Sequence, residues 1–370
     1  MKPVLYAAGL MAENDFKTMG FGTLSDAAEC LVTEERNGEY ILDMVYPASG
    51  RHYSDIMPGR IIYAYPCAQA ERPQPFEISY ISPPMSGLAK VQAIHAAQVR
   101  AAYITVNPTY TTQASAQNAL DFLKQISAGY SADAYPVSFY SNITLGAAAK
   151  FLIDRPKTLK EMLYGSEGSA LDVYGGEYYW NHDTISLLSS RGHQRNVRLT
   201  YGKNIAEISE EINLDGIATT IYPYWFNGTD YVYASASRII DSSHVSDFAY
   251  KRIVPVDVTN SLGTDTTPTQ AQVYSAGEQY IKANQIGVPD VTLSVKFFMI
   301  SQTSGYEQYA DLETVKMCDS VIVDYPPLGI SMSAKVVKTV WDVLRNRYES
   351  IEVGTVVKPS LATAILKYVR

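Results

Sequence analysis

The residue types that could carry chemistry are few and scattered along the 370-residue chain. No two histidines lie three or four positions apart, the spacing that lets two imidazoles share a metal on one helix face. The five are His52, His95, His182, His193 and His244. We interpret them as structural or solvated side chains, and the sequence predicts neither a metal site nor a cofactor.

Nucleophiles and phosphate-binding loops give equally weak signals. The three cysteines, Cys30, Cys67 and Cys318, lie far apart, which favours small buried residues over a disulfide framework or a reactive thiol. The glycines at 20 and 22 begin a dinucleotide-binding pattern, but Ser25 stands where its third glycine belongs. Carboxylate pairs such as Glu210-Glu211 are typical of a solvated face. The sequence therefore predicts no catalytic residue.

Composition and charge favour a β-rich protein that assembles with others. The chain contains 29 tyrosines, whose rings suit half-buried strands and wide subunit interfaces. A formal charge of −8 argues against a general nucleic-acid binder, which would carry a basic face. The sequence has no apolar run of about 18 residues and no basic leader, so we expect neither a membrane-spanning segment nor a secretory signal.

The elements that must position any site begin with a β-hairpin over residues 28–46. Alternating apolar residues flank Asn37-Gly38, and a tight turn of this kind needs positive φ at both central residues. Further short strands are predicted at 60–65, 76–81 and 91–95. Residues 1–97 therefore resemble one small antiparallel barrel or sandwich.

The pattern becomes mixed after residue 97 and returns to strands at 195. An alanine-rich stripe predicts a helix over 112–126, and Thr158 with Glu161 forms a capping box ahead of a short helix. The isoleucines at 205, 208 and 212 are spaced as on a helix. A further helix is predicted to start at Pro268, with Thr267 as its N-cap.

An ordered series of short motifs runs from about residue 22 to 354. These motifs are Leu24–Ala27, Val32–Tyr40, Tyr46-Pro47, Tyr53–Ile56, Gln74–Ile78, Gly175–Tyr178, Arg191-Gly192, Tyr201–Asn204, Cys318-Asp319 with Val323, Leu328–Ile330, Ala334–Val337, Arg347-Tyr348 and Ile351–Gly354. In this order they resemble the phage tail minor structural proteins, a family also called prophage endopeptidase tail or tail-associated lysin. One departure is Glu77-Ile78-Ser79, where the family usually has an aromatic residue, Arg and Ile.

The resemblance implies a baseplate or tail-tip hub that forms a homotrimer. The implied fold class is mainly β with α+β parts: two tube-like antiparallel β-barrels plus two smaller α/β domains. The expected divisions are 1–97 for the first barrel, 98–194 for a mixed α/β domain, 195–240 with 290–357 for the second barrel, 241–289 for an inserted helical or loop domain, and 358–370 for a C-terminal helix. Three chains with two barrels each would offer six similar modules to a sixfold tail tube.

Partners and location also follow from the resemblance. It implies a distal tail or tail tube protein above the hub and a tip, spike or fibre protein below it. Phage DNA would pass through the lumen without specific binding, and each chain carries −8, so we expect an acidic or neutral lumen. The expected location is the virion tail tip, after assembly in the bacterial host cytoplasm. Longer relatives continue into a peptidoglycan hydrolase or a fibre, whereas this chain ends at Arg370, so we expect no enzyme activity.

The long alternating segments 30–46 and 318–343 are the predicted subunit interfaces. The candidate interface residues are Asn37, Gly38, Tyr40, Leu42, Val323, Tyr325, Ile330 and Met332. Two alternative functions stay open. One is a peptidoglycan hydrolase with a site between Tyr178 and His193, and the other is a receptor- or carbohydrate-binding tip. In the second, Trp180, Trp225 and Trp341 would stack on sugars.

Overall fold

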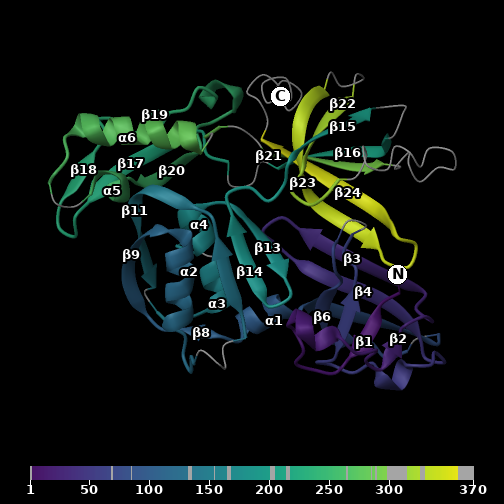
Figure 1. Ribbon diagram of the computed structural model, residues 1–370. Helices are drawn as coiled ribbons and strands as arrows, with labels where there is room; N and C mark the ends of the chain where they lie inside the picture. Colours follow the sequence, from purple (N-terminus) through teal and green to yellow (C-terminus); the bar gives the residue numbers. More distant parts are fainter. Residues whose placement is uncertain are drawn as a thin grey trace. The chain divides into compact units, whose positions relative to one another are not determined.

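The structure is a computed structural model of the chain (Figure 1). It describes residues 2–67, 70–84, 86–131, 136–153, 155–164, 168–200, 205–213, 217–263, 266–284, 286–287, 290–297, 315–325 and 330–356. The chain divides into two compact units. Unit 1 comprises residues 1–208 and 294–353, and unit 2 comprises 209–293 and 354–370. Over the described ranges, no helix is both long and apolar enough to cross a membrane.

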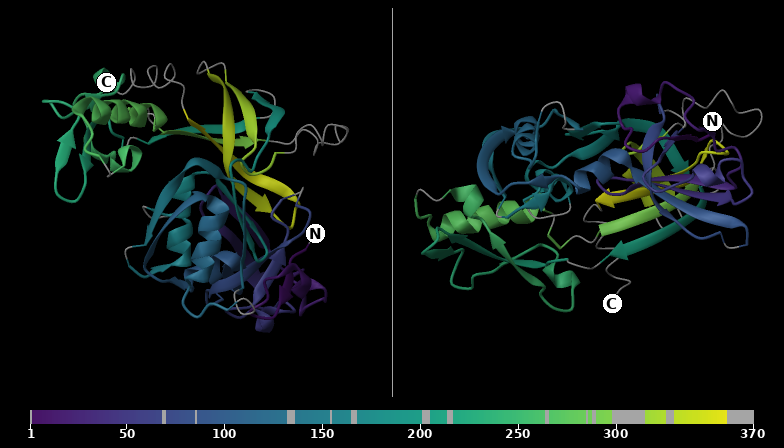
Figure 2. Two further views of the ribbon diagram at one scale, coloured as in Figure 1. Left: turned by 60° about the vertical axis from the view of Figure 1, so that its left-hand side comes forward. Right: turned by 90° about the horizontal axis from the view of Figure 1, so that it is seen from below.

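The largest described sheet is curled and holds most strands of unit 1 (Figures 1 and 2). Its strands are β1 (Val4–Tyr6), β2 (Gly22–Thr23), β3 (Glu29–Glu35), β4 (Tyr40–Pro47), β5 (Ile61–Ala64), β6 (Gln74–Ile81), β7 (Leu88–His95), β15 (Gln194–Thr200), β16 (Ile205–Asn213), β21 (Asp290–Phe297), β22 (Ser320–Tyr325), β23 (Ile330–Asp342) and β24 (Arg347–Val356). Their order is β16-β21-β24-β23-β3-β4-β7-β6-β5-β1-β2, and β22 pairs with both β15 and β23.

Strands from the two ends of the chain meet at β3 and β23. The two strands are antiparallel, with Val32 opposite Trp341 and Thr33 opposite Val340. The mainly β fold is thus as predicted, but strands that were assigned to two barrels share one continuous sheet. The division into two barrels stays a prediction.

The predicted hairpin forms between β3 and β4, with the alternation expected of a half-buried strand pair. Its turn differs from the prediction, because Asn37 adopts a φ of 56° whereas Gly38 does not have positive φ. Asn is the non-glycine residue that tolerates this region best, since its short side chain bonds locally.

The second part of unit 1 mixes helices with short sheets. Its elements are α1 (Ala96–Ala102), β8 (Thr105–Val106), β9 (Thr109–Ser115), α2 (Ala116–Gln125), β10 (Ser138–Ser141), β11 (Thr144–Ile153), β12 (Lys157–Thr158), α3 (Leu159–Leu163), α4 (Ala170–Tyr174), β13 (Glu177–Asn181) and β14 (Thr184–Leu188). Short 3₁₀ helices, η1 (Glu13–Phe16) and η2 (Tyr53–Asp55), lie in the first part. The capping box of Thr158 and Glu161 at α3 is confirmed.

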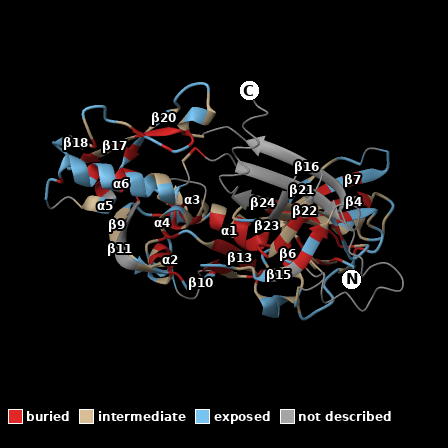
Figure 3. Cartoon of the chain, turned by 90° about the horizontal axis from the view of Figure 1, so that it is seen from above, coloured by how far each residue is buried: buried red, intermediate tan, exposed pale blue. Residues whose placement is uncertain are grey.

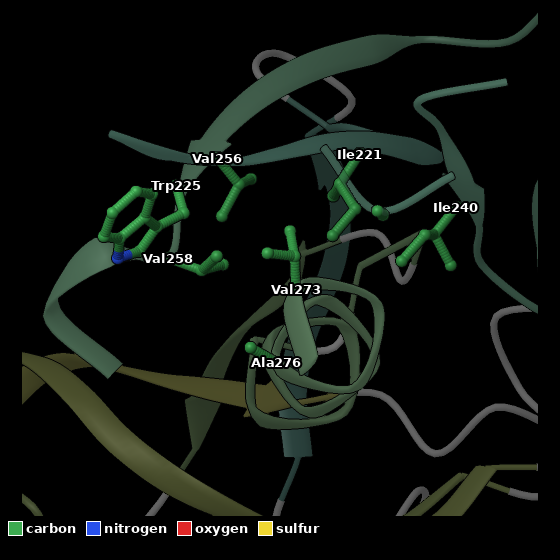
Figure 4. Packing of buried hydrophobic residues seen from close by; sticks show 8 residues of the cluster. Ile221, Trp225, Ile240, Val256, Val258, Val273 and Ala276 are labelled. Carbon is green, nitrogen blue, oxygen red and sulfur yellow. The ribbon is translucent and has the colours of Figure 1, made fainter. Parts of the chain in front are cut away.

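Unit 2 packs one helix on a small sheet. The sheet joins β17 (Thr220–Phe226), β18 (Tyr231–Tyr233), β19 (Ile240–Asp241) and β20 (Ile253–Asp257), and the helical elements are η3 (Val245–Asp247), α5 (Thr259–Leu262) and α6 (Gln270–Ala283). Figure 4 shows Val273 and Ala276 of α6 against Ile221, Trp225 and Val256 of the sheet. Figure 3 shows the outer side of α6 exposed.

Four sequence predictions need correction or fall outside the description. Strands at 218–236, predicted for the second barrel, belong to the separate sheet of unit 2, because alternation shows that a strand exists but not which sheet it joins. Residues 205–213 form the strand β16, which pairs with β21, and not a helix. The N-cap of α6 is Thr269, which accepts from Gln272 N. The predicted helix over 358–370 lies outside the described residues.

Candidate functional site

A segment of unit 1 between β14 and β15 passes directly against the backbone ahead of β22. A Cβ at Gly192 would lie 1.9 Å from Cys318 O and 2.4 Å from Asp319 N, so this position accepts only glycine. Cys318 itself has a φ of 68°. The motifs Arg191-Gly192 and Cys318-Asp319, far apart in sequence, therefore form one close backbone contact.

Asp319 fixes this contact with its buried carboxylate, which is 1% exposed. Its Oδ1 accepts from the backbone N–H of His193 at 2.8 Å, and its Oδ2 accepts from Arg195 Nε at 2.8 Å and from Lys316 N at 3.0 Å. The carboxylate accepts all three of these bonds. The aspartate thus links the start of β15 to the segment that leads into β22.

Arg191 joins the same segment to β3 through an ion pair with Glu34. The guanidinium Nη1 lies 2.6 Å from Glu34 Oε1 and 3.3 Å from Tyr178 O, and its carbon lies 4.7 Å from the centre of the Tyr179 ring. Burial acts to lower the pKa of the Arg191 guanidinium, but the neighbouring Glu34 carboxylate outweighs it, so the pKa lies above its usual range. The cation is therefore held in its charged form.

Glu177 on β13 forms the third link, to β23 and to the β3–β4 turn. Its side chain, 3% exposed, accepts from Lys335 Nζ at 2.6 Å and from Arg191 N at 2.8 Å, and it forms an ion pair with Arg36, whose Nε lies 3.3 Å from Oε1. Burial alone raises the pKa of the Glu177 carboxyl, but the bonds to Lys335 and Arg191 outweigh it, and the pKa falls below its usual value.

Asn37 completes the set, which we call the junction: Glu34, Arg36, Asn37, Glu177, Arg191, Gly192, Cys318, Asp319 and Lys335. The Asn37 side chain donates to Gly176 O at 3.0 Å and accepts from Tyr178 N at 2.8 Å, so one amide side chain continues the β13 backbone pairing. The Arg191–Arg195 stretch, basic in sequence, is thus a charge-paired joint between parts of unit 1 and offers no continuous basic surface.

A cleft of about 570 Å³ opens beside the junction within unit 1. Its walls include Glu34, Arg191 and Asp319 of the junction, together with Arg72 and Tyr348. The charged groups there are largely paired, since Arg72 pairs with Glu13 and Arg195 pairs with Asp319. The arrangement suits rigid positioning of three segments.

The thiol of Cys318 and the imidazole of His95 are both buried in unit 1. Burial raises the pKa of the Cys318 thiol to about 12, so the thiolate that would act as a nucleophile does not form at neutral pH. Burial also lowers the pKa of the His95 imidazole to about 3. Among the described residues, no group of three or more His, Cys, Asp or Glu side chains is placed to hold a metal ion.

The residues named for the alternative functions are buried. His182 is 2% exposed and Tyr178 is 2% exposed, so neither lies open to a cell-wall substrate. Trp180, Trp225 and Trp341 are at most 3% exposed and cannot stack on a sugar in this conformation. His193 is exposed, and its backbone N–H donates to Asp319 Oδ1.

The predicted interface residues occupy different environments. Tyr40, Leu42 and Val323 are at most 2% exposed and face the core of their own chain, so their side chains are corrected to core positions. Asn37 is engaged in the junction, and Gly38 O accepts from Gln98 Nε2 at 2.9 Å. The remaining three lie on the described backbone of the β22–β23 pair, with Tyr325 opposite Ile330 and Val323 opposite Met332. Their role in an interface stays a prediction.

The physical reason for this correction is the strand period of two. The large apolar residues that mark β3 and β4 in sequence point inward, and their neighbours point outward. We call the outward side of β23-β3-β4-β7-β6 the outer face. Its central row runs Val340, Thr33, Ile41, Ile94 and Glu77 across the five strands.

The outer face is half-exposed and carries more acid than base. Its ionisable side chains are Glu29, Glu35, Asp43, Glu77, Lys90 and Lys338. Lys338 Nζ lies 2.7 Å from Glu35 Oε1, and Gln92 Nε2 donates to Asp43 at 3.1 Å. A hollow of about 390 Å³ lies between Glu29, Tyr80 and Lys90. The residues of this face are part of the alternating sequence pattern. The sequence prediction chose the larger apolar residues of the same strands, which lie on the opposite, buried face.

Comparison with known proteins finds a family model and solved structures that resemble this chain. Residues 193–361 match the family model described as Prophage endopeptidase tail, which confirms the family resemblance of the ordered motifs. No curated protein matches the chain. The match includes three of the nine junction residues, Cys318, Asp319 and Lys335.

Three solved structures share the fold along nearly the whole chain. Prophage tail protein gp18 from Listeria monocytogenes EGD-e is 12% identical, with a TM-score of 0.59 over 100% of this chain and 98% of that chain. The 43 kDa tail protein of prophage MuSo2 from Shewanella oneidensis is 11% identical, with 0.58 over 98% and 100%. The tail protein from Neisseria meningitidis MC58 is 10% identical, with 0.57 over 98% of each chain.

Proposed function

We propose that this protein is a non-enzymatic structural hub of a phage or phage-like tail tip. In this proposal three copies form a ring that joins the tail tube or distal tail protein to a tip, spike or fibre protein. The family match and the fold shared with three prophage tail proteins support a structural role in a tail. In this proposal the protein is assembled in the host cytoplasm and is located at the virion tail tip.

The observation that carries the proposal is the continuous curled sheet with one buried and one half-exposed face. The β3–β23 pairing joins N-terminal and C-terminal strands without an intervening edge, so the outer face is a single broad surface. Four carboxylates and two lysines lie on it. A surface of this charge lets DNA pass, because phosphates find few cations on which to release their counterions.

Imaging of purified tail tips tests the ring directly. We expect a threefold ring at the tip with the outer face lining its channel. A ring of another symmetry, or a channel lined by clustered Lys and Arg, contradicts the proposal. Mass measurement of the purified protein supplements the image. It should be made over a range of protein concentrations, because trimer formation depends on concentration.

Added positive charge on the outer face tests the channel role. Particles that carry Glu29→Lys with Asp43→Lys should assemble normally and eject DNA more slowly, because each added cation attracts phosphate. Tyr103→Lys is the matched control, since Tyr103 is 84% exposed at the end of α1 and lies off the outer face. Equal ejection rates for the double variant and the control would remove the outer face from the channel.

The hydrolase alternative has a separate test. Purified protein should give no clearing band on a peptidoglycan gel, because His182 is buried and the Cys318 thiol is held protonated. A clearing band that disappears with His182→Ala or His193→Ala would replace the structural proposal with an enzymatic one.

A further inference from the structure

The turn of the β13–β14 hairpin is joined to β5, β6 and β7 by a buried set of polar side chains. We call this set the latch: Tyr63, Gln74, His95, Asn181 and His182. Gln74 is 4% exposed, His95 0% and His182 2%, so water does not satisfy these groups. All five residues belong to unit 1.

Gln74 stands at the centre of the latch. Its Oε1 accepts from His182 N at 2.9 Å and lies 3.3 Å from His95 Nε2, while its Nε2 donates to Asn181 Oδ1 at 3.0 Å. His182 Nδ1 lies 2.9 Å from the same Asn181 oxygen, and His182 Nε2 lies 2.9 Å from the Tyr63 hydroxyl.

These contacts determine where each imidazole carries its proton. An amide oxygen only accepts, so His95 donates from Nε2 to Gln74, and His182 donates from Nδ1 to Asn181. His182 Nε2 is then free to accept from Tyr63, and His95 Nδ1 has no hydrogen-bond partner. Every described bond of the latch is satisfied with both imidazoles neutral.

A second proton on either ring has no good place. On His182 it would sit at Nε2 and force the Tyr63 hydroxyl to turn its own hydrogen away. On His95 it would sit at Nδ1, which faces no acceptor and is closely covered by Tyr40, whose ring stacks on His95 at 4.9 Å. A buried donor without an acceptor is unfavourable.

The surroundings supply little negative charge that would stabilise a protonated imidazole in the latch. His95 packs against Tyr40 of β4, Phe76 of β6 and Trp180 of β13, and its ionisable neighbour is His182. Burial lowers the pKa of both imidazoles. Around His182, Asp183 in the turn and Asp15 of η1 partly offset burial, and Arg72 acts with it.

We propose that the latch is an acid-sensitive joint, in which protonation of His182 and then His95 frees the turn of the β13–β14 hairpin from β5–β7. The junction, at the other end of β13, keeps the hairpin attached through Glu177, whose carboxyl pKa lies below its usual value. Since the unfolded imidazole takes up protons near pH 6.5, the joint is stable above that pH and weakens as pH falls below it. The proposal does not depend on the hub role.

Hydrogen exchange on the intact chain tests this joint. After correction for intrinsic rates, we expect the protection of amides in 179–186 to fall at least tenfold from pH 7.5 to pH 5.0. Protection in 29–47 should change less than twofold. His182→Asn suits the φ of 53° at this position but cannot take up a proton there, so the acid response of its 179–186 segment should shrink to the part that His95 supplies.

Two controls make the result decisive. His193→Asn removes an exposed imidazole outside the latch and should keep the full acid response. Tyr63→Phe removes the hydroxyl that bonds to His182 Nε2, so 179–186 should be less protected already at pH 7.5, which tests the latch if His182→Asn does not fold. An acid response of full size in His182→Asn, protection of 179–186 in Tyr63→Phe equal to that of the unaltered chain, or equal loss of protection in 29–47 overturns the proposal.

Discussion

The junction of unit 1 and the core of unit 2 achieve rigidity by different means. The junction is polar, with buried carboxylates at Glu177 and Asp319 and a glycine pressed against backbone. The core of unit 2 is apolar and rests on one helix, α6, packed on a four-stranded sheet. The stability of the junction depends on the geometry of its polar contacts, whereas the stability of the unit 2 core depends on the apolar area that it buries.

This difference teaches where each unit is sensitive to change. An apolar core tolerates substitutions that keep volume, because dispersion contacts are numerous and individually weak. A charged joint does not, since the removal of one partner leaves a buried charge unpaired. The comparison predicts larger single-residue effects in the junction than in the core of unit 2.

The largest effect is expected for Gly192→Ala. The added methyl cannot fit 1.9 Å from Cys318 O, so the backbone of two segments must separate, at a cost of at least about 3 kcal/mol in the free energy of unfolding of unit 1. Denaturant unfolding measures this. Gly129→Ala is a control without a clash, because no atom lies near its Cβ position, and the strain of its positive φ alone should cost about 1–2 kcal/mol. Equal costs would mean that close approach at Gly192 is unimportant.

A medium effect is expected for the ion pair between Arg191 and Glu34. Arg191→Met leaves Glu34 buried without its cation and should destabilise unit 1 by about 3 kcal/mol, less where solvent screens the pair. The double variant Arg191→Met with Glu34→Leu should regain a third or more of that loss, because no charge then stays unpaired. Additive losses in a double-mutant cycle would contradict a coupled pair.

The smallest effect is expected in the core of unit 2. Val273→Ala removes two methyl groups from the face of α6 that packs on the sheet and should cost about 2 kcal/mol. Limited proteolysis should show faster cleavage within 217–284 and unchanged cleavage within 29–47. If Val273→Ala opens both regions equally, the contrast between the two units does not hold.

Sequence alone was sufficient for local structure and for the family. The β3–β4 hairpin, the capping box of α3 and the strand patterns follow from alternation and cap chemistry, which act over a few residues. The ordered motifs, none informative by itself, led to the family resemblance that the match over 193–361 supports. Local preference failed at 205–213, where isoleucine spacing indicated a helix and strand pairing with β21 prevailed.

Tertiary structure decided which of these segments meet. Arg191-Gly192, Cys318-Asp319 and Glu177 are separated by up to 142 positions, and only folding shows that they form one joint. Inward and outward positions of β4 were equally visible in sequence, but burial alone shows that Tyr40 and Leu42 fill the core while Asp43 faces outward. The reason is physical: periodicity and capping are properties of neighbours along the chain, whereas ion pairing, close backbone contact and sheet membership depend on residues that only the fold brings together.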